Sequence, residues 1–142
     1  MRMLVMVKAS KESEAGVPPT AELIAAMGRF NEELTKNGIL LAAEGLQPSS
    51  KGVRVHFSGD KRTVVDGPFT ETKELVAGFW IWEVKSMAEA VEWVKRCPNP
   101  MLSESDIEIR PVGSLEDFGP GLLEKAQGML EAEKKSRAHT GN

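Results

Sequence analysis

Two segments of this chain are apolar on both faces of an extended strand, and this pattern constrains the fold more than any other feature of the sequence. The first runs from Met1 to Ala9 and the second from Leu75 to Lys85. In the second segment Trp80 and Trp82 alternate with Phe79, and apolar side chains on both faces are typical of a strand that is covered on both sides. Both segments are therefore predicted to be central strands of a sheet.

Each of these strands is followed by a helical pattern. The first helix is predicted to run from the N-cap Thr20 to Asn37, because apolar residues recur between them at helical spacing. The second opens at Ser86, which forms a capping box with Glu89, and ends before Pro98. The segment between the first strand and the first helix is predicted to be a loop.

The remaining strands complete a known plan. Ile39–Leu46 and Asp106–Val112 are predicted strands, and residues 53–66 are predicted to form a hairpin around the turn Gly59-Asp60, with one face exposed to solvent. The order is that of a ferredoxin-like β-α-β-β-α-β fold of the α+β class with an inserted β-hairpin. This plan makes its first and third strands central, and these are the two segments that are apolar on both faces.

Two helices can cover only one face of such a sheet. The second apolar face then needs another cover. Two sheets that pack face to face in a homodimer would supply it. A homodimer is therefore the expected assembly.

The C-terminal part of the chain lies outside this plan. After Gly119-Pro120-Gly121 a further helix is predicted from Leu122 to about Lys135, packed on the body or on a second subunit, and Ser136–Asn142 is predicted to be a frayed end that contains His139. The expected division is a ferredoxin-like domain over residues 1–118 and a C-terminal helical extension over residues 119–142.

Composition and charge narrow the class of protein. Lys and Arg number 18 against 21 Asp and Glu, a formal charge of −3, and the basic clusters are short, so no nucleic-acid partner is expected. No stretch approaches the roughly 18 apolar residues that span a bilayer, so no membrane association is expected. The apolar run Met1–Lys8 is too short for a secretory signal, and the single Cys97 cannot form an internal disulfide, so a cytoplasmic location is expected.

One motif resembles a known family. The segment Asp66–Glu74 reads DGPFTETKE and resembles the signature of the DGPF-domain family, part of the YCII-related group. Glu44–Pro48 and Ile107–Val112 resemble that family's second and last core strands. The resemblance covers roughly Met1 to Phe118 and implies a dimeric ferredoxin-like α+β barrel, the fold also predicted from the hydrophobic pattern.

The resemblance also implies kinds of function. Many family members are encoded beside alternative sigma factors, and the wider superfamily contains cofactor-free isomerases, lyases and monooxygenases that act on small aromatic or lactone-like molecules. YCII-related proteins are thought to use a histidine of the first helix with an aspartate. This chain has no histidine between Thr20 and Asn37, so only the aspartate, Asp66, is carried over from that pair.

Asp66 has two interpretations. In the first, it hydrogen-bonds to backbone amides and holds a tight turn before Gly67 and Pro68. In the second, it faces a pocket with Glu71, Lys73 and Glu74, where a lysine among carboxylates would set one of them as a general base.

Two further residues are candidates for the same site. Glu44 ends an otherwise apolar strand, where an unpaired carboxylate is costly to bury; it is either a structural partner of Arg110, Arg54 or Lys73, or a member of the site. His56 is the one histidine inside the predicted fold. It is either a solvated strand residue or a substitute for the missing helix histidine, oriented against Asp66.

Other features are expected to be structural. The aromatic residues of the strand Leu75–Lys85 are expected in the core or a dimer interface rather than in an aromatic pocket. Cys97 is expected to be a small buried hydrophobe. His, Cys and carboxylates form no cluster at metal-ligand spacing, and no Gly-rich loop opens onto a helix, so neither a metal nor another cofactor is expected.

The first functional hypothesis is a small cofactor-independent enzyme with a pocket between the sheet and the first helix. Asp66 is its leading acid-base group, with Glu44, Glu71, Lys73 and His56 around it. The alternative is a non-catalytic ligand-binding or regulatory module linked to sigma-factor-controlled transcription, using the same pocket for a small-molecule ligand or the dimer surface for a protein. A purely structural role is the third hypothesis.

Overall fold

The computed structural model describes residues 1–140, except the side chains of Leu123, His139 and Thr140. Contacts within the chain group its residues into two units, Met1–Pro111 and the residues from Val112 onward. The predicted division into residues 1–118 and 119–142 stays a prediction.

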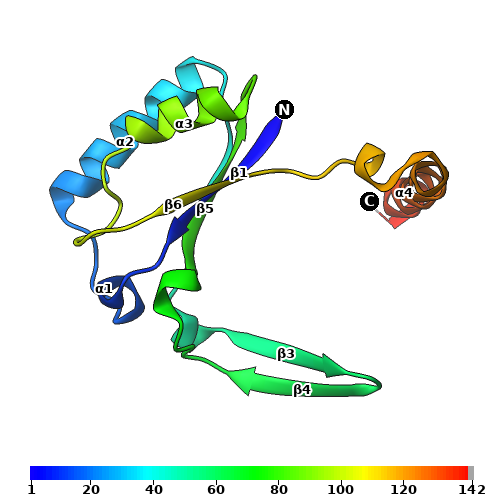
Figure 1. The fold of residues 1–142 in the computed structure, drawn as a ribbon, viewed down its shortest axis with the longest axis horizontal. Helices are drawn as coiled ribbons and strands as arrows, with labels where there is room; N and C mark the ends of the chain where they lie inside the picture. The colour runs from blue at the N-terminus through cyan, green and yellow to red at the C-terminus, as the bar shows by residue number, and fades with distance from the viewer. Residues whose placement is uncertain (141–142) are drawn as a thin grey trace. The chain divides into compact units, whose positions relative to one another are not determined.

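The first unit is built on a four-stranded antiparallel sheet in the order β2-β5-β1-β6 (Figure 1). The strands are β1 (Arg2–Lys8), β2 (Leu40–Gly45), β5 (Val76–Glu83) and β6 (Ile107–Pro111). The central strands are β1 and β5, the two that the sequence predicted to be central. The predicted ferredoxin-like α+β fold is therefore confirmed.

Helices α2 (Ala21–Lys36) and α3 (Met87–Lys95) cover one face of this sheet (Figure 1). Their predicted N-caps are confirmed. The hydroxyl of Thr20 accepts a hydrogen bond from the Leu23 amide, and that of Ser86 accepts one from the Glu89 amide. Such caps satisfy backbone donors that the first helical turn leaves free, typically contributing about 1 kcal/mol each.

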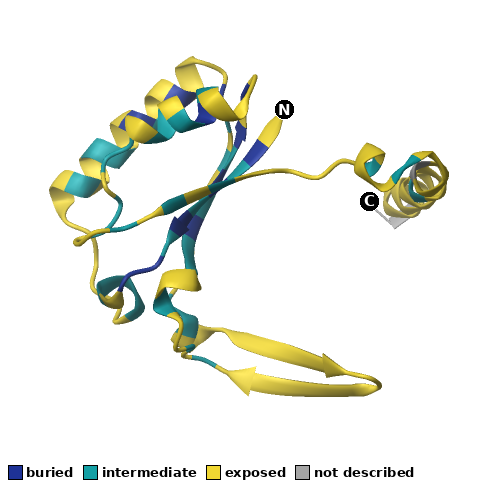
Figure 2. Cartoon of the chain, viewed as in Figure 1, coloured by how far each residue is buried: buried dark blue, intermediate teal, exposed yellow. Residues whose placement is uncertain are grey.

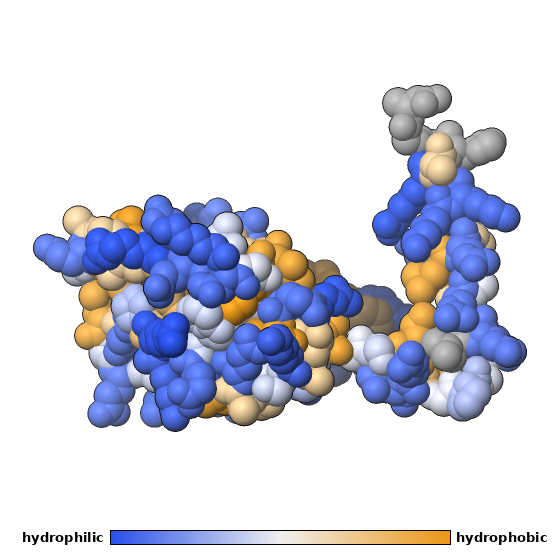
Figure 3. All heavy atoms as spheres, turned by 90° about the horizontal axis from the view of Figure 1, so that it is seen from above, coloured by the Kyte–Doolittle hydropathy of each residue, from blue (hydrophilic) through white to orange (hydrophobic). Residues whose placement is uncertain are grey.

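The core lies between the helices and the sheet, where buried residues gather (Figure 2). Its largest fully buried side chains are Trp82, Met3, Leu34 and Val5. The Phe30 ring on α2 packs edge-on against Trp80 at a centroid distance of 6.0 Å. From the helix side, hydrophilic side chains predominate over the outer surface of the first unit, with hydrophobic patches at its margins (Figure 3).

The opposite face of the sheet is apolar and only half-buried. Leu4 pairs with Ile81 and Met6 pairs with Phe79 across β1 and β5, and all four side chains are of intermediate exposure. This is the face for which the sequence predicted an additional cover.

The inserted hairpin consists of β3 (Val53–Ser58) and β4 (Lys61–Asp66), which form a separate two-stranded sheet (Figure 1). All residues of both strands are exposed (Figure 2). The prediction that only one face would be exposed is wrong, because alternation shows which side chains share a face and not whether anything covers it. Phe57, on the more apolar face, is 66% exposed.

One short helix was not predicted. Helix α1 (Lys11–Glu14) lies in the segment predicted to be a loop, and Ser10 and Ser13 close a capping box around its first turn. A helix of four residues is too short to show hydrophobic periodicity.

The second unit contains a 3-10 turn, η3 (Leu115–Phe118), and helix α4 (Pro120–Thr140). The helix starts near its predicted position and extends five residues beyond Lys135, through most of the segment predicted to be frayed. Residues 141 and 142 lie outside the described part of the chain. Over the described residues, no helix has the length and apolar character needed to cross a membrane.

Candidate functional site

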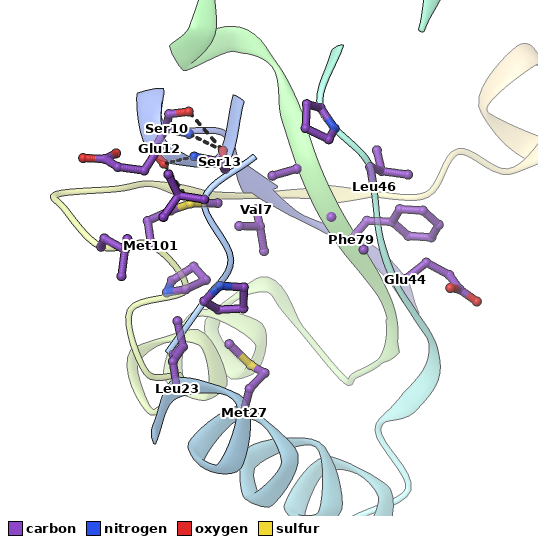
Figure 4. A pocket seen from close by; sticks show the side chains of 18 of the residues that line it. Val7, Ser10, Glu12, Ser13, Leu23, Met27, Glu44, Leu46, Phe79 and Met101 are labelled. Atoms are coloured by element: carbon purple, nitrogen blue, oxygen red, sulfur yellow. Dashed lines mark hydrogen bonds between the residues drawn. The ribbon is translucent and has the colours of Figure 1, made fainter. Parts of the chain in front are cut away.

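A pocket of about 530 Å³ lies between the helix-covered face of the sheet and α2 (Figure 4). Its lining comes from β1, β2, β5, α2, the segment around α1, and the loop before β6. The first hypothesis placed its pocket in this region, between the sheet and the first long helix.

The floor of the pocket is short of side chains. In the register of β2 and β5, Gly45 pairs with Gly78 and Ala43 pairs with Trp80. Trp80 packs on Phe30 of α2, and residues two apart in a strand share a face, so both glycines lie on the α2 side. Two paired glycines leave the backbone of the sheet bare, and this gives the pocket its depth.

The two glycines differ in the space around them. A Cβ atom at Gly78 would lie 3.0 Å from the carbonyl oxygen of Glu44, whereas one at Gly45 would meet nothing within 4 Å. A side chain at position 45 would therefore enter the pocket without a backbone clash.

Apolar side chains form the walls. Leu23 and Met27 reach in from α2, Val7 from β1 and Met101 from the loop before β6 (Figure 4). They come from segments far apart in the sequence, so only the folded topology brings them together.

The pocket also contains a fixed amide. The indole Nε1 of Trp80 donates a hydrogen bond of 2.9 Å to Oδ1 of Asn31, and both residues line the pocket. Sequence reasoning did not single out Asn31. A signal was present, because Asn31 lies four residues after Met27 and three before Leu34, on the apolar stripe of the helix.

Around α1 the rim is polar but internally bonded. The Ser10 hydroxyl accepts from the Ser13 amide at 3.1 Å, and the Ser13 hydroxyl accepts from the Ser10 amide at 2.9 Å (Figure 4). The Ser10 hydroxyl also donates to Sδ of Met101 at 3.2 Å. The bond to Met101 ties the N-cap of α1 to the loop before β6.

Glu12 is the ionisable residue of this rim. A hydrogen bond with its own backbone lowers the pKa of the Glu12 carboxyl, with further help from the hydroxyls of Ser10 and Ser103. Glu12 is therefore ionised at neutral pH and is a poor proton acceptor.

Glu44 borders the pocket, but its side chain points away from it. Glu44 pairs with Phe79, and both side chains lie on the other side of β5 from Leu23 and Met27 (Figure 4). The Glu44 side chain is exposed, so water solvates the carboxylate. Among the described residues it forms no ion pair with Arg110, Arg54 or Lys73.

The DGPF motif fastens the base of the hairpin. The Gly67 amide donates to the Gly52 carbonyl at 3.0 Å, and the Phe69 amide donates to the hydroxyl of Ser49 at 3.0 Å. Ser49 is held in turn by the carboxylate of Glu14, which accepts from both its amide and its hydroxyl. The motif thus connects the hairpin to α1 through backbone amides.

Asp66 stands at the exposed end of β4, opposite Val53. His56 is exposed in β3 opposite Thr63, and strand alternation puts it on the other face of the hairpin from Asp66.

Glu71 and Lys73 are exposed in and beside the 3-10 turn η2 (Thr72–Glu74). Of the five predicted site residues, Glu44 alone lines this pocket. The structure places Asp66, His56, Glu71 and Lys73 elsewhere, on the hairpin and in the segment that follows it. Within the described residues, no group of three or more His, Cys, Asp and Glu is arranged to hold a metal ion.

Fold and pocket together define a small ferredoxin-like α+β protein with a ligand-sized cavity under its first long helix. The sequence profile of the YCII-related domain matches residues 1–114. This chain therefore belongs to the YCII-related family, and the predicted resemblance is confirmed.

Individual proteins are also similar to this chain. An uncharacterised protein of Rhizobium meliloti (strain 1021) is 33% identical over 78 residues, which make up 55% of this chain and 60% of that protein. The chain thus spans about 60% of the relative's length, less than two thirds. Among solved structures, 5-chloro-2-hydroxyhydroquinone dehydrochlorinase from Burkholderia phenoliruptrix AC1100, in complex with 2,5-dihydroxybenzoquinone, is similar to this chain at 19% identity. The similarity covers 80% of this chain and 96% of that chain, with a TM-score of 0.43.

Proposed function

We propose that this YCII-related protein binds a small, largely apolar molecule in the pocket between the sheet and α2. The observation that carries the proposal is the cavity itself, about 530 Å³ in volume with a glycine floor and apolar walls. Ligand pockets typically span roughly 300–1,000 Å³, with mostly apolar linings and a few placed polar groups.

The glycine pair strengthens the proposal. Glycine in a strand adds backbone entropy to the unfolded chain and packs no side chain; here Gly78 lies inside β5 and Gly45 is the last residue of β2. The Gly45 position has room for a Cβ atom, so packing does not require glycine there. An open floor for a ligand is a reason for its presence.

The proposal is tested by filling the pocket. Gly45→Val places a branched side chain on the open floor, and indane serves as the small apolar probe. In the wild-type protein, indane is expected to shift the amide NMR resonances of Gly78, Met27 and Met101. Gly45→Val is expected to weaken indane binding at least tenfold.

Gly28→Ala is the matched control, because Gly28 is exposed on α2 with open space around it and does not line this pocket. It should bind indane as the wild-type protein does. Equal affinity in Gly45→Val, or shifts confined to other residues, would contradict the proposal.

Acid-base catalysis at the DGPF motif is a second proposal. Its support is that Asp66, Glu71 and Lys73 are all open to solvent near the base of the hairpin, where a substrate has access to them. Once a ligand is known, Asp66→Asn should lower its turnover by roughly 100-fold or more if Asp66 is the general base. Unchanged turnover would remove Asp66 from the reaction, and a ligand that is bound and never converted would favour the regulatory alternative.

We also propose that the protein is a homodimer joined through the uncovered face of the sheet. The support is the half-buried apolar set Leu4, Met6, Phe79 and Ile81, which no helix covers within the first unit. A cytoplasmic location is part of the same proposal and is supported by the single cysteine.

A further inference from the structure

The charge of the lining restricts what the pocket can take. In the part of the chain that the structure describes, the ionisable residues of the lining are Glu12 and Glu44, both acidic. Glu12 is at the rim and Glu44 points to the other face of the sheet (Figure 4). An anion inside would find no opposite charge and would lose its hydration, so the interior disfavours carboxylates and phosphates.

Asn31 is the side-chain amide among the lining residues, and its orientation is fixed. An indole Nε1 can only donate, so the 2.9 Å bond from Trp80 identifies the Asn31 atom that it reaches as the oxygen. The Trp80 ring is itself held by Phe30 at 6.0 Å and by Trp82 at 5.7 Å between centroids. The amide therefore cannot flip without losing a bond anchored in the core.

The fixed orientation leaves Nδ2 of Asn31 as the free end of the amide. Among the described residues no acceptor is within hydrogen-bond distance of Nδ2 in suitable geometry, and Asn31 is half-buried rather than enclosed in the core. A hydrogen-bond donor in this position favours ligands that carry an acceptor over ligands that do not. A ligand without an acceptor there would remove water from Nδ2 without replacing its hydrogen bond.

We propose that Asn31 is the specificity-determining residue of the pocket and that the ligand is an uncharged, mainly apolar molecule with an oxygen acceptor, such as a carbonyl, that binds Nδ2. This inference rests on the proposed function, since it assigns the chemistry of the same pocket.

The test compares three molecules of one shape. Indane has no acceptor, 1-indanone carries a carbonyl, and 1-indanecarboxylate is an anion. Dissociation constants are measured by NMR titration in the wild-type protein, in Asn31→Asp and in Asn31→Leu. Aspartate keeps an oxygen for Trp80 Nε1 but has no N–H, and leucine has a similar shape with neither group.

Both variants are expected to weaken 1-indanone binding roughly tenfold, the loss of about one hydrogen bond. Asn31→Leu is expected to tighten indane binding, because indane then no longer removes water from an unpaired N–H. The carboxylate is expected to bind the wild-type protein at least tenfold more weakly than 1-indanone. Asn37→Asp is the matched control, because Asn37 caps the exposed end of α2; it should leave all three affinities unchanged.

The outcomes separate the two proposals. If indane and 1-indanone bind in the pocket and both variants affect them equally, Asn31 is not the specificity determinant, although the pocket remains a ligand site. Tight binding of the carboxylate would overturn the uncharged ligand class. Binding of neither neutral probe would contradict the ligand site itself, and the role of Asn31 with it.

Discussion

At the scale of single residues, the glycine of the DGPF motif is set by a close approach of backbone to backbone. A Cβ atom at Gly67 would lie 1.8 Å from the carbonyl oxygen of Ser49, which no ordinary contact allows. The motif glycine is therefore explained by packing at the base of the hairpin. Asp66 beside it makes no side-chain hydrogen bond to the turn within the described residues, so the turn is held by other groups.

We expect Gly67→Ala to destabilise this region by about 1–3 kcal/mol, the usual cost of overpacking. Hydrogen exchange at the Phe69 amide should become faster, and urea denaturation should show a lower midpoint if the loss reaches the core. Gly52→Ala is the matched control, because a Cβ atom there would lie 3.5 Å from the same Ser49 oxygen, an ordinary contact. Equal exchange rates at the Phe69 amide in the two variants would contradict the prediction, because they would show that the backbone around Ser49 shifts to accept the added methyl group at little cost.

Cys97 provides a second prediction at this scale. Burial raises the pKa of its thiol to about 12, from a reference of 9.0. At pH 8 only about one thiol in ten thousand is then ionised, so iodoacetamide should modify the folded protein far more slowly than the urea-unfolded chain. Because the folded pKa is the higher one, the contribution of this group to stability should decline as pH rises from about 9 to 12. Equal rates in the folded and unfolded states would contradict this environment.

At the scale of elements, the hairpin and the core both contain large apolar side chains, but those of the hairpin are exposed and those of the core are buried. Phe57 in β3 is 66% exposed, while Phe30 in α2 is 5% exposed. The hairpin is held by its own backbone ladder and by the bonds at its base, and its more apolar face lies open. A two-stranded hairpin of this kind is marginal without further support.

Phe57→Ser should therefore change the free energy of unfolding by less than about 0.5 kcal/mol, whereas Phe30→Ala should lower it by about 3–5 kcal/mol. Urea denaturation of the two variants measures both values. A large loss in Phe57→Ser would mean that another surface covers the hairpin in solution.

Elements with strong local signals were predictable from the sequence. The caps at Thr20 and Ser86 and the central places of β1 and β5 follow from side chains near one another along the chain. The exposure of the hairpin and the presence of α1 do not follow in this way. A helix of four residues is too short to show hydrophobic periodicity. The exposure of the hairpin depends on whether another segment covers it, and alternation along a strand does not show this.

At the scale of the whole molecule, the uncovered sheet face argues for association. We expect Ile81→Glu to convert the proposed homodimer into a monomer, because it would bury a charge in an apolar interface at a cost of several kcal/mol. Size-exclusion chromatography with light scattering measures the mass. Ile24→Glu is the control, because Ile24 is 60% exposed on α2, and it should leave the mass unchanged. A wild-type protein with the mass of one chain would refute the dimer.

The candidate site shows where prediction from sequence stops. A pocket between the sheet and the first long helix was predicted, with Glu44 grouped around Asp66; Glu44 borders the pocket and Asp66 does not line it. The interior was not predicted, because Gly45 and Gly78 meet only through strand register, and Asn31 gains its role from a tryptophan 49 residues away. Asp66 belongs to the most distinctive motif of the chain, yet that motif does not line the pocket. Its backbone amides form hydrogen bonds at the base of the hairpin instead.

Because Trp80 lines the pocket, ligand binding should be detectable through the intrinsic tryptophan fluorescence of the protein. Trp80 lines the cavity and Trp82 lies 5.7 Å behind it, whereas Trp93 is on α3 with the Arg96 guanidinium over its ring. A molecule that enters the cavity will change the surroundings of Trp80 and leave those of Trp93 as they are. Intrinsic fluorescence, with Trp93→Phe to remove the constant background, can therefore screen compound libraries for the natural ligand without any added dye.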